Sequence, residues 1–214
     1  MQSPSMKTDQ AAEHLQTIRT LMERSALYRR ALAPIMIFCG FAGMAGGIAG
    51  WTLRVGSSRG FALLWMGVAV FAVVGAFLLV RRQAVRESEP FWSPPTRRVA
   101  LALAPAFLAG VILTIPFLIL DWHEVVWIWW LPVVWTTLYG LALHSAGFFM
   151  PRGIRLFGWG FVLCGMAMFI VGTCLPRLIS PIQQAHLVMG IIFGGLHLAY
   201  GTYLYLTEQR KNAA

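Results

Sequence analysis

Six long apolar segments without a single charged residue constrain this chain more than any other feature of its sequence. They cover residues 31–53, 61–80, 99–120, 125–150, 156–175 and 183–206. An α-helix needs about 20 apolar residues to cross the hydrocarbon core of a bilayer, and an ionisable side chain at the bilayer centre costs at least about 2.5–3.5 kcal/mol on insertion scales. The sequence therefore predicts an all-α polytopic membrane protein with six transmembrane helices.

The composition of the chain excludes a water-soluble globular domain. Hydrophobic residues make up 58% of the 214 residues and charged residues only 12%, against a usual share of roughly 25%. Loops that face anionic lipid explain the net charge of +9, so no direct binding of nucleic acid is expected. All three cysteines lie in apolar segments without histidines at metal-site spacing, which predicts small buried side chains and no metal site: Cys39, Cys164 and Cys174.

Lysine and arginine divide unevenly between the two sides of the predicted bundle. Fourteen of the 17 fall in the two tails and in loops 81–98 and 151–155, whereas three fall on the other side: Arg54, Arg59 and Arg177. Because cytoplasmic loops are enriched in these residues, this predicts a multi-pass protein of the bacterial inner membrane with both termini in the cytoplasm. Tryptophans near the opposite boundary predict an aromatic belt there: Trp51, Trp65, Trp122, Trp127, Trp129 and Trp130.

The transmembrane domain is predicted over residues 31–206, between cytoplasmic tails of residues 1–30 and 207–214. Residues 9–30 have an amphipathic pattern, which predicts an interfacial helix on the inner leaflet or a docking helix for a cytoplasmic partner. Prolines in loop 81–98 predict an extended connection rather than a helix. Prolines within the spans predict kinks or local openings at three positions: Pro105, Pro116 and Pro132.

Glycine residues form one-sided rows in the first and last apolar segments. Small residues on one face allow two helices to approach closely in lipid. The rows therefore predict packing surfaces within the bundle, or alternatively a seam between copies in a homo-oligomer or a larger membrane complex. Steps of three and four residues connect the members of each row: Gly40, Gly43, Gly47 and Gly50 in the first segment, and Gly190, Gly194 and Gly201 in the last.

Three histidines fall within the predicted transmembrane segments, where they are the candidates for a binding site. His144 and His197 lie at depths that differ by only about 4 Å at 1.5 Å per residue, so the two side chains could face each other. His186 shares the helix face of His197, nearer the opposite boundary. Each histidine is interpreted as part of an interhelical hydrogen bond, as a cofactor-binding ligand of haem b, or as part of a polar substrate path.

The sequence carries no recognisable catalytic motif. The acidic residues are confined to tails and loops, and the sequence has no HExxH, GxSxG or P-loop motif. The first hypothesis is therefore a non-enzymatic inner-membrane subunit or sensor that acts through helix packing and a basic cytoplasmic face. The alternatives are a small-solute facilitator or transporter and a b-type haem-binding membrane protein.

Four stretches of the chain form a recognisable set: TIRTLMERSALYRRALAP, PFWSPPTRRVALALAPAFLAG, LPVVWTTLYGLALHSAGFFMPRGIRLFGWGF and GIIFGGLHLAYG. Through them the chain resembles, over nearly its whole length, a group of uncharacterised bacterial integral membrane proteins with six spans and an amphipathic N-terminus. Leu138 to Gly140 and Phe193 to His197 match its most recognisable parts, whereas His144 and His186 lie outside the pattern. Members are often encoded beside a small winged-helix regulator, which the resemblance implies as a candidate cytoplasmic partner. It implies no activity, cofactor or catalytic residue.

A reporter fused after Ala214 is expected to be cytoplasmic, and one inserted within residues 121–124 is expected to be exported. The expectation rests on the unequal division of Lys and Arg between the two sides. Alkaline phosphatase and green fluorescent protein measure it as a pair, because the first is active only after export and the second only in the cytoplasm. An exported C-terminus would mean that the first two spans are miscounted.

Overall fold

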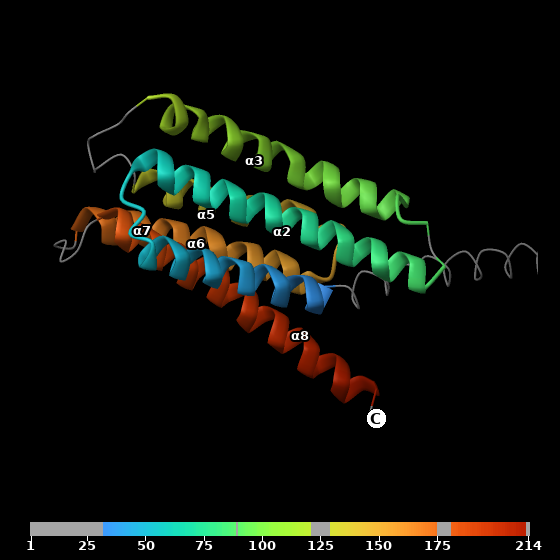
Figure 1. The fold of residues 1–214 in the computed structure, drawn as a ribbon. Coiled ribbons are helices and arrows are strands. Elements are labelled where there is room, and N and C mark those ends of the chain that lie inside the picture. The colour runs from blue at the N-terminus through green and yellow to red at the C-terminus, as the bar shows by residue number, and fades with distance from the viewer. Residues whose placement is uncertain (1–31, 89, 121–128, 175–180, 213–214) are drawn as a thin grey trace, which may run out of the picture.

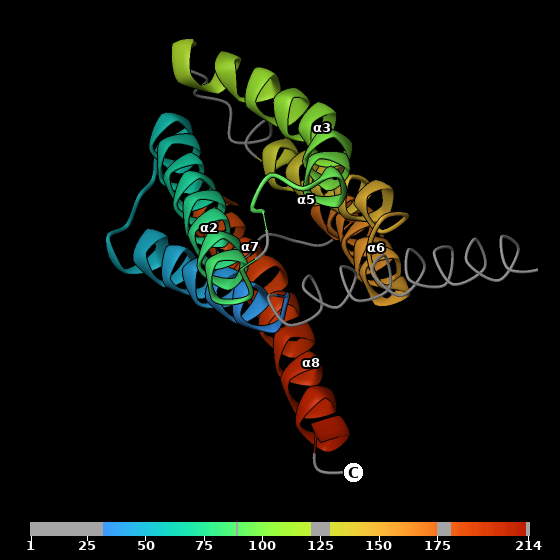
Figure 2. The same ribbon diagram turned by 90° about the vertical axis from the view of Figure 1, so that its right-hand side faces the viewer.

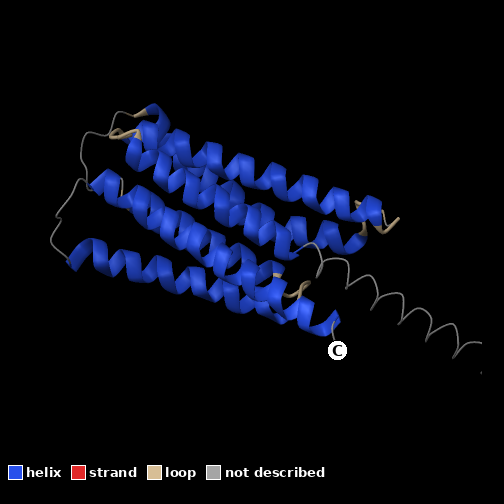
Figure 3. Cartoon of the chain, turned by 60° about the horizontal axis from the view of Figure 1, so that its bottom comes forward, coloured by secondary structure: helices blue, strands red, loops and turns tan. Residues whose placement is uncertain are grey.

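The computed structural model describes residues 32–88, 90–120, 129–174 and 181–212. These residues form helices joined by turns and short loops, and they contain no β-strand (Figure 3). In chain order the helices are Leu32–Thr52, α2 (Ser58–Arg86), α3 (Pro94–Ile119), α5 (Trp130–Ala146), α6 (Arg152–Cys174) and a continuous C-terminal helix. The C-terminal helix consists of α7 (Pro181–Met189), the π-helical turn η1 (Gly190–Gly195) and α8 (Leu196–Asn212) (Figure 1).

Several of the helices are long and apolar enough to cross a membrane. The described residues contain five such stretches: Leu32–Thr52, Ser58–Arg86, Thr96–Ile119, Arg152–Gly172 and Ile182–Thr207. The predicted all-α class is therefore confirmed, and the five helices fit a polytopic membrane protein. α5, with 17 residues, covers positions 130–146 of the predicted fourth span, whose residues 125–128 lie outside the described ranges. The interfacial helix predicted at residues 9–30 lies outside them as well.

The connection between α2 and α3 is much shorter than the loop predicted at residues 81–98, and the prediction of an extended segment is wrong at both of its ends. α2 continues to Arg86 and α3 already begins at Pro94, so residues 87–93 join the two helices. Pro94 and Pro95 begin α3 rather than prevent it. The first turn of a helix has no intrahelical acceptor for its N–H groups, and the fixed φ of proline suits a helical start.

The prolines within the predicted spans do not break their helices. α3 runs as one helix through Pro105 and Pro116, and Figure 1 shows it as a continuous ribbon. Pro132 lies in the first turn of α5, where its missing N–H would have no intrahelical partner. The kink predicted at Pro132 is therefore wrong, because the residue stands at the beginning of its helix rather than within it.

The helices form two groups, which Figure 2 shows side by side. The first group contains Leu32–Thr52, α2 and the C-terminal helix, and the second contains α3, α5 and α6. In the second group α5 packs against both α3 and α6. Side chains from both groups meet in a buried apolar cluster, whose members are Leu32, Met36, Leu143, Ile154, Phe157 and Phe161.

The glycine rows of the first and last helices lie against each other. A Cβ atom added at Gly43 would lie 2.9 Å from the backbone nitrogen of Gly194, and one added at Gly47 would lie 2.8 Å from Cα of Gly190. These distances leave no room for a side chain, so the two backbones are in direct contact. Three further glycines continue the contact towards both ends of the rows: Gly40, Gly50 and Gly201.

A second close contact joins α5 to α6. A Cβ atom added at Gly140 would lie 2.7 Å from the carbonyl oxygen of Gly158. A Cβ atom added at Gly165, seven residues after Gly158, would collide with the side-chain hydroxyl of Thr137 on α5. Sequence analysis missed this seam, although a spacing of seven residues keeps glycines near one side of a helix and was the available signal.

The substitutions Gly190→Leu and Gly194→Leu are each expected to destabilise the fold or change its assembly. A bulky side chain would force the first helix away, at a cost of at least about 1–3 kcal/mol, the usual range for overpacking. Gly195→Leu is the matched control, because a Cβ atom added at this neighbouring glycine meets no atom within 4 Å. Thermal unfolding in detergent and elution volume in gel filtration measure the effect.

Normal stability and normal elution of both variants would rule out close packing at these glycines. Loss of an oligomer with an intact monomer would instead identify the row as a seam between subunits.

Candidate functional site: two buried histidine centres

His197 is fully buried near the beginning of α8, and both of its ring nitrogens have hydrogen-bond partners. Nδ1 lies 2.7 Å from the carbonyl oxygen of Phe193, and Nε2 lies 2.7 Å from the hydroxyl oxygen of Tyr139 on α5. A carbonyl oxygen only accepts, so Nδ1 carries the proton and Nε2 accepts from the Tyr139 hydroxyl. A neutral imidazole therefore satisfies both partners. We call these three residues the His197 centre.

The π-helical turn η1 positions this centre. It ends at Gly195, directly before α8, and it contains Phe193, whose carbonyl oxygen accepts from His197. Single π-helical turns are rare within helices and occur frequently at functional sites. Sequence analysis missed the turn, because the residues that form it carry no signal that separates i→i+5 from i→i+4 hydrogen bonding.

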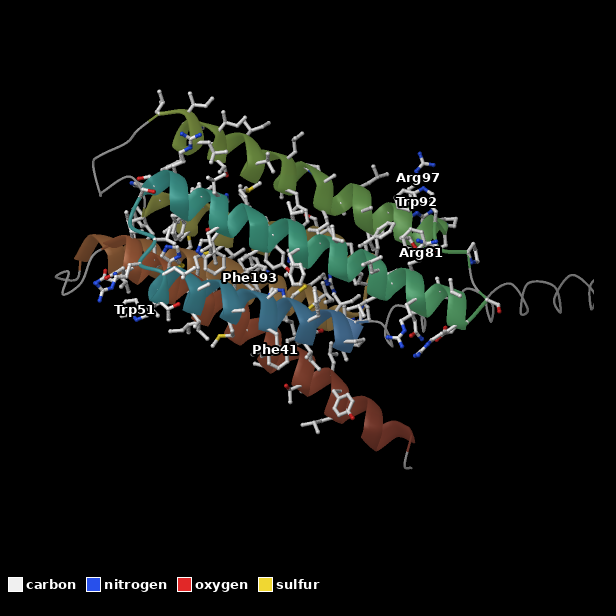
Figure 4. All side chains as sticks on the ribbon, in the orientation of Figure 1. Phe41, Trp51, Arg81, Trp92, Arg97 and Phe193 are labelled. Atoms are coloured by element: carbon white, nitrogen blue, oxygen red, sulfur yellow. The ribbon has the colours of Figure 1, made fainter. Side chains whose placement is uncertain are left out.

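Aromatic rings from several helices surround the His197 centre. The Tyr139 ring lies 6.1 Å from the ring of Phe107 on α3 and 4.9 Å from that of Phe161 on α6, measured between centroids. The His197 ring lies 5.2 Å from the ring of Phe157, also on α6. The centre therefore joins the two helix groups in surroundings of low polarity, where a hydrogen bond is stronger than in water. Figure 4 labels Phe193 in the middle of the bundle.

His186 of α7 forms a second buried centre, nearer the end of the bundle where α2 begins. Trp65 of α2 donates its indole N–H to Nδ1 of His186 over 3.1 Å, and Nε2 lies 3.2 Å from the carbonyl oxygen of Val55. His186 therefore carries its proton on Nε2, the opposite tautomer to His197. The imidazole lies against Gly50 of the first helix, which leaves space for it, and 4.8 Å from the ring of Phe61. We call His186, Trp65 and Val55 the His186 centre.

The structure does not bring His144 and His197 together, although the two lie at similar depths. His144 is five residues after Tyr139, which at 100° per residue places it about 140° further round the α5 axis. Its ring contacts Phe148 at 5.5 Å and Trp159 at 5.6 Å, and its Nδ1 has no hydrogen-bond partner among the described residues. The facing arrangement predicted from depth is therefore wrong.

Two tryptophans of the predicted aromatic belt are buried hydrogen-bond donors instead. Trp65 donates to His186, and the indole N–H of Trp129 donates to the carbonyl oxygen of Met168 over 3.1 Å. The belt prediction is wrong for this pair, because their N–H groups find acceptors on other helices. The remaining members are exposed or lie outside the described residues: Trp51 and Trp130 in the first case, Trp122 and Trp127 in the second.

A third polar contact, also missed from the sequence, joins α5 to α3. The indole N–H of Trp135 lies 3.1 Å from the Thr114 hydroxyl oxygen and 3.2 Å from the carbonyl oxygen of Gly110. Thr114 is buried and itself donates to that carbonyl over 2.7 Å. A threonine within a span of apolar side chains was the available signal, because a hydroxyl in hydrocarbon requires a partner.

Comparisons of this chain with known protein families, with curated proteins and with solved structures find no match. Among the described residues, no three His, Cys, Asp or Glu side chains lie close enough together to hold a metal ion.

His197→Leu is expected to lower the free energy of unfolding by about 0.6–2 kcal/mol, the range measured for hydrogen bonds within membranes. The variant removes the acceptor of the buried Tyr139 hydroxyl. His197→Gln is expected to retain much of the stability, because an amide offers both a donor and an acceptor. Thermal unfolding in detergent measures both variants.

Tyr139→Phe supplies the control for this prediction. In the double variant with His197→Leu no unpaired hydroxyl remains, so the combined loss is expected to be smaller than the sum of the two single losses. Strictly additive losses would contradict a direct hydrogen bond between the two side chains.

Proposed function

We propose that this chain is a six-span inner-membrane protein that acts as a non-enzymatic subunit or sensor through helix packing and its basic cytoplasmic face. The proposal rests on the hydrogen bonds of the polar groups inside the bundle, which are made to other groups of the chain. His197 and His186 each direct both ring nitrogens to groups of the chain itself, and Tyr139 is bonded to His197. Ionisable residues within a membrane commonly mark a substrate or ion path, but here their hydrogen bonds join helices.

The arrangement of the chain ends supports six spans with both termini on one side. In Figure 1 the beginning of the first helix and the C-terminus lie at the same end of the bundle. In the same orientation Figure 4 labels Arg81 and Arg97 at this end and Trp51 at the other. The end with the larger share of Lys and Arg is proposed to face the cytoplasm. α5 then belongs to the fourth span, and residues 1–30 and 207–214 form cytoplasmic tails.

The proposed partner is a protein on the cytoplasmic side or a neighbouring membrane subunit. The resemblance to bacterial proteins encoded beside a winged-helix regulator favours a regulator as the cytoplasmic partner. A tagged chain purified from its native membranes in mild detergent is expected to carry a partner that mass spectrometry identifies. The double variant Arg82→Gln with Arg86→Gln should lose a cytoplasmic partner. Arg54→Gln with Arg59→Gln, which removes the same charge from the opposite end, should keep it.

The same purified protein distinguishes the alternatives. A haem-binding protein would show a Soret absorbance band that His197→Leu abolishes, and none is expected. A small-solute facilitator would raise solute uptake into liposomes above the level of empty vesicles. Either signal, without a stable partner, would overturn the proposed subunit function.

A further inference from the structure

The hairpin formed by α2 and α3 carries positive charge beyond the apolar parts of both helices. α2 has 29 residues, so it is about 44 Å long, whereas the hydrocarbon core of a bilayer is about 30 Å thick. Its apolar part ends at Val80, and Arg81 is the first charged residue after it. The last turns of α2 therefore extend to the level of the lipid headgroups.

Arginines from both helices are exposed at this end of the hairpin. α2 contributes Arg81, Arg82 and Arg86, and the beginning of α3 contributes Arg97 and Arg98. Figure 4 shows the labelled Arg81, Trp92 and Arg97 at one end of the bundle. Glu87, the acidic residue among the described positions of the connecting segment, accepts a hydrogen bond from the Gln83 amide.

The connecting segment folds back against the side of α2. The ring of Phe91 meets that of Phe77 edge-on, with 4.7 Å between centroids, and Phe77 lies one helical turn before Arg81. The next residue, Trp92, is 60% exposed. An indole held at this height is typical of the boundary between hydrocarbon and water.

Exposed apolar side chains lie one helical turn into the membrane from an arginine on each helix. Phe77, four residues before Arg81, is 48% exposed, and Leu101, four residues after Arg97, is 61% exposed. Four residues correspond to about 6 Å along a helix. The hairpin therefore presents charged side chains at the level of the headgroups and apolar side chains one turn deeper, on the same two helices.

Guanidinium groups, rather than the N-terminus of α3, supply the positive charge. Pro94 and Pro95 occupy the first two positions of α3, so two of the N–H donors that a helix N-terminus usually offers are missing. The hydroxyl groups of Ser93 and Thr96 lie 2.9 Å apart and bond to each other. The exposed arginines of the hairpin, Arg81 and Arg97 among them, are therefore the groups able to bind an anion.

We propose that the α2–α3 hairpin binds an anionic phospholipid. The phosphate lies at the guanidinium groups of Arg81 and Arg97, the Trp92 indole lies at the level of the glycerol backbone, and the acyl chains run along Phe77 and Leu101. A soluble acidic protein or a nucleic acid would match the arginines of this surface but would make no contact with its apolar side chains. The proposal goes beyond the subunit function and holds whether or not a protein partner exists.

Native mass spectrometry tests the proposal on the purified full chain in maltoside detergent. Phosphatidylglycerol is the anionic probe, and phosphatidylcholine with the same acyl chains is the zwitterionic probe. The wild-type chain is expected to bind phosphatidylglycerol more tightly. Arg81→Gln with Arg97→Gln should weaken that binding about 25-fold, roughly fivefold for each arginine, and leave phosphatidylcholine unchanged.

Arg54→Gln with Arg59→Gln is the matched control, because it removes two exposed arginines at and just before the beginning of α2, the opposite end of that helix. It should leave phosphatidylglycerol binding at the wild-type level. Equal losses in the two double variants, or no loss in the Arg81 and Arg97 variant, would overturn the proposal. Displacement of the lipid by an equal concentration of glycerol phosphate would overturn the part assigned to the acyl chains.

The single variant Arg97→Gln, at an exposed side chain, keeps the test valid if the double variant unfolds. Its thermal unfolding should match that of the wild type, and its affinity for phosphatidylglycerol should fall about fivefold. Unchanged affinity in this folded variant would count against the proposal.

Discussion

The first and last helices of the chain pack backbone to backbone, and the rest of the structure depends on this contact. Gly43 and Gly47 meet Gly194 and Gly190 at distances that exclude a side chain. Helices in a membrane gain little from the hydrophobic effect when they associate, because lipid is as apolar as they are, so close van der Waals contact must hold them together. The contact also closes the bundle, because it joins the first described helix to the C-terminal helix.

The two histidine centres build on this contact. With the C-terminal helix held against the first helix, His186 reaches Trp65 of α2, and His197 reaches Tyr139 of α5. The two rings hold opposite tautomers, each set by a backbone carbonyl that accepts from one nitrogen. An unpaired donor or acceptor in hydrocarbon is unfavourable, so these bonds select which helices pair and in which register. The centres thereby support a function in which a defined helical assembly matters more than a reaction.

The α2–α3 hairpin is proposed to bind a lipid through polar and apolar groups together. Within the bundle, His186 and His197 bond to groups on neighbouring helices, whereas the guanidinium groups of Arg81 and Arg97, at the end where α2 meets α3, are exposed. Their charge adjoins exposed apolar residues on the same helices, an arrangement that matches a phospholipid from headgroup to acyl chain. A protein partner and a bound lipid would then act on neighbouring parts of one face.

The sequence alone determined the all-α class and showed which glycines share a helix face, because both depend on spacing along a single helix. It did not determine which faces meet, how far polar helix ends continue, or where the last helix becomes π-helical. His144 shows the difference: its depth follows from counting residues, but its separation from His197 depends on the rotation of α5 against α8. Trp65 shows it again, since a tryptophan near a boundary lies in the interface unless another helix offers an acceptor, as His186 does. Contacts between helices join residues far apart in sequence, so only the tertiary structure decided them.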